Sequence, residues 1–508
     1  MTSILLIYPY FKPPRDRSVF RFPPLGVSYL AASLREAGHS VDILDCTFLQ
    51  RDEALGRALS REVEVVGIYC MVTLMDDCLW FARNLRNHCK LLVAGGPLPT
   101  CDPAFFLKDF DVVVQGEGEQ TVVELIRCFD ENTSLEAVPG IVYRKKAASG
   151  EKKQDDIVFT ADRPFQKDLD RFPFPARDLL PNQDYINHTR QKYGFSITTV
   201  MSTRGCPYRC EFCSNVVFGG SYRSRSYSNV VDEIDEVLKL GYDRISFADD
   251  VFTLNNKRVL QICAEIQRRG LHFQWECLAR VDSIDYPTAL EMKQAGCYRI
   301  YFGIESGDDK ILQLIDKKIN LPQARQAVED AHTAGLEVGA FFILFYPGDT
   351  DETVLTTLRF ANSLPLDYLG LSMPYPLPGT ALYERVKNQI NREWRPGRFS
   401  QRNRGLGLSQ ATESPAITPT KNPPPWGGGK GVGKSRLRDF REALWYPAES
   451  LFGSHVLIYN GDFSERKMWF GIIKGHAQFW IKKRFGKLAP LVTRLFDVPT
   501  DFFLRLLK

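Results

Sequence analysis

The sequence has no long hydrophobic run and no strong excess of either charge. Its longest apolar stretch beyond the N-terminus, residues 338–346, is about half the ~20 residues of a membrane-spanning helix. The first eight residues lack a basic segment and end at Pro9, so they predict a strand rather than an export signal. With 65 Lys and Arg against 61 Asp and Glu, the net charge is only +4, too small to suggest a basic face for nucleic acid. We therefore expect a cytoplasmic protein that has no transmembrane segment and binds no nucleic acid.

Twelve cysteines are present, and without an export signal they predict thiols and metal ligands rather than disulfides. Nine of them are scattered along the chain. Free cysteine is often buried as a small apolar side chain, so these nine need no chemical role. The remaining three cysteines are grouped, and they are considered below.

The first part of the chain alternates β-rich runs with helical patterns. Strands are expected over residues 4–8, 41–45, 65–70, 91–94 and 111–114, and helices over 26–37, 53–59, 75–87, 103–107 and 120–128. This alternation predicts an α/β fold, a doubly wound parallel sheet spanning residues 1–145.

Ligands of such sheets bind at the carboxyl ends of the strands. The candidate binding residues there are Thr73, Gly95, Gly96, Gly116 and Glu117. Glycine lets a large ligand approach the backbone closely, although the same glycines are also compatible with ordinary turns.

A second alternating series predicts a partial β/α (TIM-like) barrel over residues 195–385. Its strands are expected at 197–202, 244–247, 273–278, 298–304, 337–345 and 368–373, with helices between them. In such barrels the reactive groups lie at the carboxyl ends of the strands. Residues 146–194 are expected to connect the two domains, with a hairpin tip near 147–153. A low-complexity linker at 386–436 and a mostly helical C-terminal region at 437–508 complete the organisation.

The grouped cysteines are Cys206, Cys210 and Cys213, on the loop after the first barrel strand. Thiolates are soft ligands for iron, and a short loop that carries three of them can fold round an iron–sulfur cubane. Zinc is the main alternative, but a closed zinc site needs four ligands and no fourth lies nearby in the sequence. Three thiolates on four irons would leave one iron open to a chelating substrate.

This spacing, with the aromatic Phe212 before the third cysteine, resembles the radical S-adenosylmethionine (SAM) superfamily. The preceding sheet domain resembles the cobalamin-binding domain of the cobalamin-dependent branch, and the likeness covers roughly residues 3–385. The resemblance implies a 4Fe-4S cluster held by the three cysteines, with SAM bound at the open iron. It also implies cobalamin as a further cofactor.

The resemblance also implies roles for residues at successive strand ends. Asp249 or Asp250 would grip the SAM amino group, although the family's glycine-rich form of this segment is absent and the choice between them is open. Arg280 would pair with the SAM carboxylate, and Glu305, followed by Ser306, would accept the ribose hydroxyls. The alternative for Arg280 and Glu305 is a surface ion pair or a cap.

The N-terminal domain departs from the common cobalamin pattern. No Asp-x-His-x-x-Gly loop follows the first strand, His39 is the first histidine, and Leu98 stands where a Gly-Gly-Pro-His loop would carry its histidine. If cobalamin binds, the resemblance therefore implies a cobalt whose lower face has no histidine ligand. The alternative is a domain that has kept the fold and lost the cofactor.

In the C-terminal region, Trp469, Ile472, Ile473 and Trp480 recur at helical spacing beside the basic residues 482–484. Such a helix either packs on its own domain or lies in a membrane interface. The second reading predicts peripheral contact with the inner membrane face and a hydrophobic or lipid-like small-molecule substrate.

For function, the resemblance implies reductive cleavage of SAM, fed by a low-potential electron donor such as ferredoxin or flavodoxin. The resulting radical would remove hydrogen from an unactivated carbon that then accepts a methyl group from cobalamin. A cobalamin-dependent radical cyclase or oxidase without methyl transfer is the alternative within enzymes. A non-catalytic iron–sulfur or cobalamin sensor is the alternative outside them.

Overall fold

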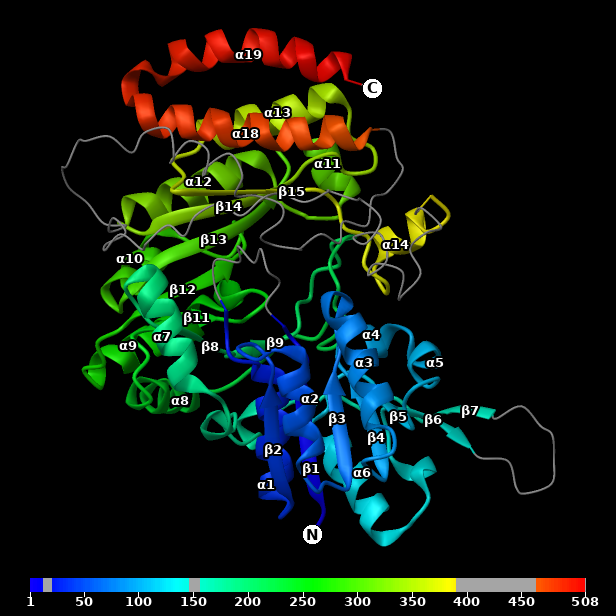
Figure 1. Ribbon diagram of the computed structural model, residues 1–508. Helices are drawn as coiled ribbons and strands as arrows, with labels where there is room; N and C mark the ends of the chain where they lie inside the picture. Colours follow the sequence, from blue (N-terminus) through cyan, green and yellow to red (C-terminus); the bar gives the residue numbers. More distant parts are fainter. Residues whose placement is uncertain (12–20, 146–155, 390–462, 508) are drawn as a thin grey trace, which may run out of the picture.

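The computed structural model describes residues 1–11, 21–145, 156–389 and 463–507 of the chain. The N-terminal half is a seven-stranded sheet in the order β2-β1-β3-β4-β5-β6-β7 (Figure 1). The first five strands are parallel, and β6 and β7 are added antiparallel. The strands are β1 (Ser3–Tyr8), β2 (Ser40–Asp45), β3 (Val65–Tyr69), β4 (Leu91–Gly95), β5 (Val112–Val114), β6 (Ile141–Lys145) and β7 (Asp156–Phe159).

Helices cover both faces of this sheet, which confirms the doubly wound fold. On one face, apolar residues of α1 and α6 form a core with the strands, and on the other face α2 and α3 do the same. Each helix supplies an apolar stripe at helical spacing, and burial of that stripe holds it to the sheet. The helices are α1 (Leu25–Glu36), α2 (Arg51–Leu59), α3 (Met75–Leu85), α4 (Pro97–Cys101), α5 (Pro103–Phe106) and α6 (Glu119–Glu131).

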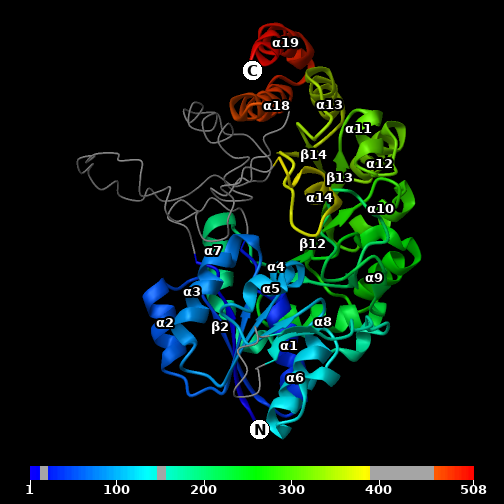
Figure 2. The ribbon, with the colours of Figure 1, turned by 90° about the vertical axis from the view of Figure 1, so that its right-hand side faces the viewer.

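The second half is a parallel six-stranded sheet in the order β15-β14-β13-β12-β11-β8, with helices along its outer side (Figures 1 and 2). Its end strands, β8 and β15, do not pair with each other, so the predicted partial barrel is confirmed. Its strands are β8 (Ile197–Val200), β11 (Arg244–Phe247), β12 (Gln274–Ala279), β13 (Cys297–Glu305), β14 (Glu337–Ile343) and β15 (Tyr368–Ser372).

Side-chain caps fix where the barrel helices begin. Ser226, Asn255 and Asp285 each accept a hydrogen bond from a backbone N–H of the first turn, while Asn320 and Thr350 form capping boxes. The helices are α8 (Tyr227–Lys239), α9 (Asn256–Arg268), α10 (Tyr286–Gln294), α11 (Asp309–Leu314), α12 (Leu321–Thr333) and α13 (Asp351–Ser363).

The region expected to connect the domains contributes to both. Within it, β7 extends the first sheet, whereas α7 (Asn182–Tyr193) packs Tyr185 and Ile186 into the core of the barrel. The expected hairpin tip at 147–153 lies outside the described residues, as does most of the expected linker. Short elements complete this part of the chain: β9 (Thr203–Arg204), β10 (Arg223–Ser224), α14 (Ala381–Val386), η1 (Val72–Leu74), η2 (Leu135–Ala137), η3 (Leu169–Arg171), η4 (Arg177–Leu179) and η5 (Phe252–Leu254).

Two helices, α18 (Glu465–Phe485) and α19 (Ala489–Leu506), are joined by η6 (Gly486–Leu488) and form the helical C-terminal region. In α18, Gly471 and Gly475 lie against the barrel, where an added Cβ would come within 2.4 Å of Phe345 and of Leu371. Because these positions are glycine, α18 packs closely on the barrel and buries Ile472. Of the two alternatives that the sequence left open for this helix, packing on its own domain is therefore the one that α18 adopts. Among the described residues, no helix combines the length and apolarity needed to cross a membrane.

Buried ion pairs join the two halves. Arg204, in β9, donates to Glu119 at the start of α6 over 2.6 Å. Arg223, in β10, makes a two-pronged contact with Glu117, at 2.7 and 3.0 Å. A fully buried charge is tolerated only when it is paired, so these contacts fix the relative position of the two domains.

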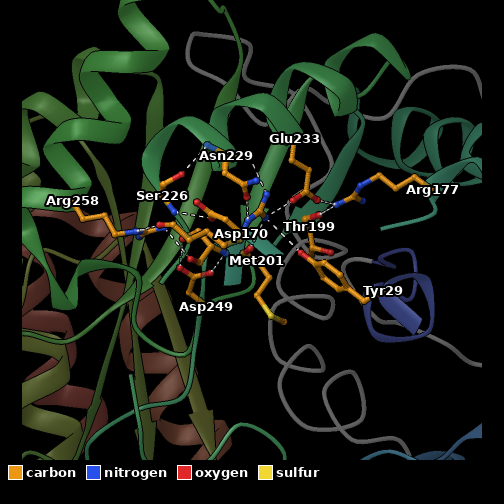
Figure 3. Close-up of polar contacts among 12 residues, drawn as sticks. Tyr29, Asp170, Arg177, Thr199, Met201, Ser226, Asn229, Glu233, Asp249 and Arg258 are labelled. Carbon is orange, nitrogen blue, oxygen red and sulfur yellow. Dashed lines mark hydrogen bonds and ion pairs between the residues drawn. The ribbon is translucent and has the colours of Figure 1, made fainter. Parts of the chain in front are cut away.

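A second buried network lies beside this junction (Figure 3). Glu233 of α8 accepts from Arg177 over 2.6 Å and also from Arg225. Arg225 in turn approaches the Tyr29 hydroxyl of α1 at 3.5 Å. The network therefore links a helix of the first domain to a helix of the barrel.

Candidate functional site

The three grouped cysteines lie on the loop between β9 and β10, at the carboxyl end of the first barrel strand. The loop turns at Gly205, which has φ +80°, and a Cβ there would lie 2.4 Å from the Ser221 carbonyl oxygen. The Cys213 N–H donates to the Cys210 carbonyl over 3.0 Å, and the Asn215 amide donates to the Cys206 carbonyl over 3.2 Å. The backbone thus curls so that all three thiols come from one short turn.

The neighbouring barrel elements hold this loop in place. Cys210 and Phe212 pack beside an apolar cluster from α11, β14 and α14. The Glu211 carboxylate accepts from the Tyr346 hydroxyl over 2.7 Å and pairs with Arg385 at 2.8 Å. Sequence reasoning missed these supports, because nothing local connects residues 135 or more positions apart.

The three thiols differ in their exposure to solvent. Cys206 and Cys210 are half-buried and Cys213 is exposed. In the described residues, no three or more His, Cys, Asp or Glu side chains are gathered round one point as ligands of a single ion. In a cubane each thiolate binds a different iron, so such convergence is not required. Burial raises the pKa of Cys206 and Cys210, so binding iron must displace their protons.

The two aspartates at the end of β11 have different surroundings. Asp249 is buried and accepts from the backbone N–H of Ser202 over 2.6 Å and from the Ser202 hydroxyl. It therefore ties the end of β11 to the end of β8. Asp250 is exposed, and its charge acts on the Cys206 and Cys213 thiols, so it lies beside the cysteine loop. Of the pair, Asp250 is the carboxylate available to a ligand.

Arg280 follows β12 and is almost wholly buried. Its Nε and Nη2 groups donate to Asp282 over 2.9 and 2.8 Å, and its guanidinium stacks at 3.4 Å from the centre of the Tyr208 ring. Among the described residues, Nη1 has no hydrogen-bond acceptor. Asp282 thus engages Nε and Nη2, and Nη1 is left for the predicted pairing with a ligand carboxylate.

Glu305 ends β13 in a left-handed conformation, with φ +70°. It forms a buried ion pair with Lys317, whose Nζ lies 3.0 Å from Oε1. Burial alone would lower the pKa of Lys317, but the Glu305 carboxylate raises it. Ser306 is buried too, and its hydroxyl lies 3.1 Å from that of Thr357 and accepts from the Asp308 N–H, which is the pattern of a local turn.

A cavity of about 410 Å³ opens at the carboxyl end of the first sheet, between the strands and the helices α1 and α6. Gly95, Gly96, Gly116 and Glu117 line it, as predicted for a ligand at this edge. Thr73 does not line it and lies exposed on η1. Because Glu117 is paired with Arg223, its carboxylate joins the domains. The barrel closes the cavity with four residues: Met201, Arg204, Val217 and Phe218.

Known proteins resemble both halves. Residues 200–361 match the model of the radical SAM superfamily, and residues 14–126 match that of the B12 binding domain. An uncharacterized methyltransferase of Pyrococcus horikoshii is 33% identical over 399 residues, which cover 75% of this chain and 82% of that protein. The chain belongs to the radical SAM superfamily, in the branch with a B12 binding domain. It is therefore an enzyme.

Two further relatives differ in activity. The anaerobic magnesium-protoporphyrin IX monomethyl ester cyclase of Cereibacter sphaeroides is 25% identical over 405 residues, covering 76% of this chain and 64% of that protein. The structure of the radical SAM methyltransferase TsrM from Kitasatospora setae, with cobalamin and a [4Fe-4S] cluster bound, superposes with a TM-score of 0.64 at 18% identity. It covers 76% of this chain and 75% of that one, which shows a shared fold.

The cofactors of this radical SAM enzyme are a 4Fe-4S cluster, SAM and cobalamin. The residues present fit them: three thiols from one turn suit the cluster, and a glycine-edged cavity walled by both domains suits part of a corrinoid. The sequence of the loop after β1, residues 9–24, contains no histidine that could serve as a ligand of cobalt.

We predict that Asp250→Asn weakens SAM binding. Asp249→Asn should leave the affinity for SAM unchanged. Losing a charge-assisted hydrogen bond costs about 1.5–3 kcal/mol, or roughly ten- to a hundredfold in affinity. Equilibrium dialysis of SAM with the reconstituted protein measures the effect. For Asp249→Asn we expect a lower melting temperature, because its partner Ser202 lies at the buried end of β8. Unchanged SAM affinity in Asp250→Asn would remove Asp250 from the site.

We also predict that Gly95→Leu weakens cobalamin binding and leaves iron bound. Gly95 lines the cavity and has room for a Cβ, whose nearest neighbour would be Val114 at 3.9 Å, so the added side chain fills the ligand space. Overpacking costs about 1–3 kcal/mol, roughly five- to a hundredfold in affinity. Visible absorption reports cobalamin and a colorimetric assay reports iron. Gly56→Leu, on the open surface of α2, is the matched control and should retain both.

Proposed function

We propose that this protein is a cobalamin-dependent radical SAM methyltransferase acting on an unactivated carbon of a small, hydrophobic substrate. The observation that supports it most is the shared wall of the cavity. Gly95 and Gly116 of the first domain line it together with Val217 and Phe218, which lie on the same loop as the cysteines. A corrinoid held there would adjoin the cluster loop, as methyl transfer between the two cofactor sites requires.

When bound, the reduced cluster supplies the electron that breaks the bond from sulfur to the adenosyl carbon of SAM, and cobalamin carries the methyl group to the substrate carbon. The chain's own residues bind and orient. Cys206, Cys210 and Cys213 hold the cluster, and Asp250 receives the SAM ammonium group. Nη1 of Arg280 donates to the SAM carboxylate. Glu305, anchored by Lys317, accepts from the ribose hydroxyls.

The surroundings of the cysteine loop support an apolar substrate. Tyr375, Tyr383 and Leu382 pack with Phe212 beside Cys210, so one side of the cluster site is apolar and excludes water there. Cys213 is the exposed member of the trio, and we propose that this edge of the cluster faces a low-potential donor such as ferredoxin or flavodoxin.

A second candidate is a cyclase or oxidase that uses cobalamin without methyl transfer, and the similarity to the Cereibacter sphaeroides cyclase favours considering it. One experiment separates the candidates. The protein is reconstituted anaerobically with iron, sulfide and hydroxocobalamin, reduced, and incubated with methyl-labelled SAM. We expect methionine and 5′-deoxyadenosine from one molecule of SAM, and S-adenosylhomocysteine from a second molecule whose labelled methyl group is recovered in the cobalamin fraction. Cleavage without labelled cobalamin would favour the cyclase or oxidase, and no cleavage would favour a non-catalytic sensor.

A further inference from the structure

The C-terminal helix α19 has one face that is firmly attached to the protein. Leu504 and Ala489 are buried there. The side chain of Lys474, in α18, is completely buried and binds Asp497 and Asp501 of α19, each at 2.8 Å. These contacts fix the rotation of α19 about its own axis, so its other side is held facing outward.

That outward side is apolar. Five residues separated by three or four positions form a stripe along the helix, and each is between 59% and 72% exposed: Leu491, Leu495, Val498, Phe502 and Leu506. The helix lies at the end of the molecule farthest from the first sheet (Figures 1 and 2). Side chains of this type along a whole exposed helix face mark a contact surface.

The two exposed charged residues of α19 itself, Arg494 and Arg505, are both basic. Arg494 lies within the span of the stripe, and Arg505, near its end, also pairs with Glu352 of α13. The acidic residues of α19, Asp497 and Asp501, both face inward to Lys474. An apolar face flanked by arginines, with its acids turned away, complements the surface of an anionic membrane.

A partner helix fits this face less well. A coiled-coil partner needs a narrow, regular seam, but Phe503, 50% exposed, widens the apolar side beyond the stripe. Pro499 lies within α19, where proline disturbs the regular helix that such packing requires. We infer that the outer face of α19 binds the surface of an anionic membrane. This inference does not depend on methyl transfer, and it places the contact on α19 rather than on the tryptophans of α18.

Flotation of the full-length reconstituted protein with vesicles tests the inference. We compare vesicles of phosphatidylcholine with vesicles of an equimolar mixture of phosphatidylcholine and phosphatidylglycerol. The wild type should float with the anionic vesicles, and less so in high salt. The double variant L495E/F502E should bind them about tenfold or more weakly, because it removes two inserted apolar side chains. Arg494→Gln should also reduce binding to the anionic vesicles, but by a smaller factor than the double variant.

Leu260→Glu is the control, since Leu260 is an exposed leucine on a different helix, α9, and it should float as the wild type does. Circular dichroism and bound iron show whether each variant is folded. The inference is overturned if the wild-type protein binds neither kind of vesicle. It is also overturned by a wild-type dimer in solution that L495E/F502E converts to a monomer, because the face would then join two copies of the chain.

Discussion

Alanine at Cys206, Cys210 or Cys213 is expected to reduce iron affinity by more than about 100-fold and to abolish SAM cleavage. Losing a residue that merely supports a ligand costs about 10–100-fold in metal affinity, so losing the ligand itself should cost more. Alanine has no lone pair for iron, and the described residues nearby include no spare thiol on this loop. Iron content and 5′-deoxyadenosine formation after anaerobic reconstitution measure the two effects.

The control for these variants is Cys89→Ala, a half-buried cysteine after α3 in the first domain. It should keep both iron and activity, because its thiol lies on a different domain from the cluster loop. If the three single variants retained iron and turnover like this control, the assignment of the cluster to this loop would be wrong.

Glu233→Ala is expected to lower the free energy of unfolding by about 3–5 kcal/mol. The substitution leaves Arg177 and Arg225 buried without their shared carboxylate, and an uncompensated buried charge is costly. Urea unfolding followed by circular dichroism measures the loss. Glu236→Ala, at an exposed position of the same helix, should change stability by less than about 0.5 kcal/mol.

The same carboxylate makes stability depend on acid pH. Burial alone would raise the pKa of Glu233, but Arg225 and Arg177 outweigh it and the pKa in the folded protein is lowered from 4.5. Glu233 therefore binds a proton less tightly in the folded state than in the unfolded state. The stabilising contribution of the Glu233 carboxylate is complete above pH 4.5. It is lost as the pH falls through the lowered pKa of the folded state. The acid-induced loss of stability should be smaller in Glu233→Ala.

Much of the fold could be predicted because its signals are local. Strand and helix limits matched the structure closely, since apolar periodicity decides burial and caps such as Ser226 and Asn255 decide where helices start. The cysteine spacing is equally local. The antiparallel strands β6 and β7 were not anticipated, because residues 141–159 lack a pattern that separates a sheet edge from a connector.

The rest of the site depends on contacts between distant residues. Glu117 was proposed as a ligand residue, but its partner Arg223 is 106 positions away and sequence alone does not pair them. The choice between Asp249 and Asp250 required knowing which one is buried. Arg280 was predicted to pair with the SAM carboxylate, and the sequence did not show that Asp282, only two positions away, already binds its Nε and Nη2 groups.

The wall that the two domains share around the cavity has a consequence for how stable the enzyme becomes once its corrinoid is bound. Arg204 both lines the cavity and pairs with Glu119, so a corrinoid held there would lie against a contact that joins the two domains. Loading the cavity should therefore strengthen the domain junction as well as the first domain. The holoenzyme should melt at a higher temperature than the apoprotein, and in one transition.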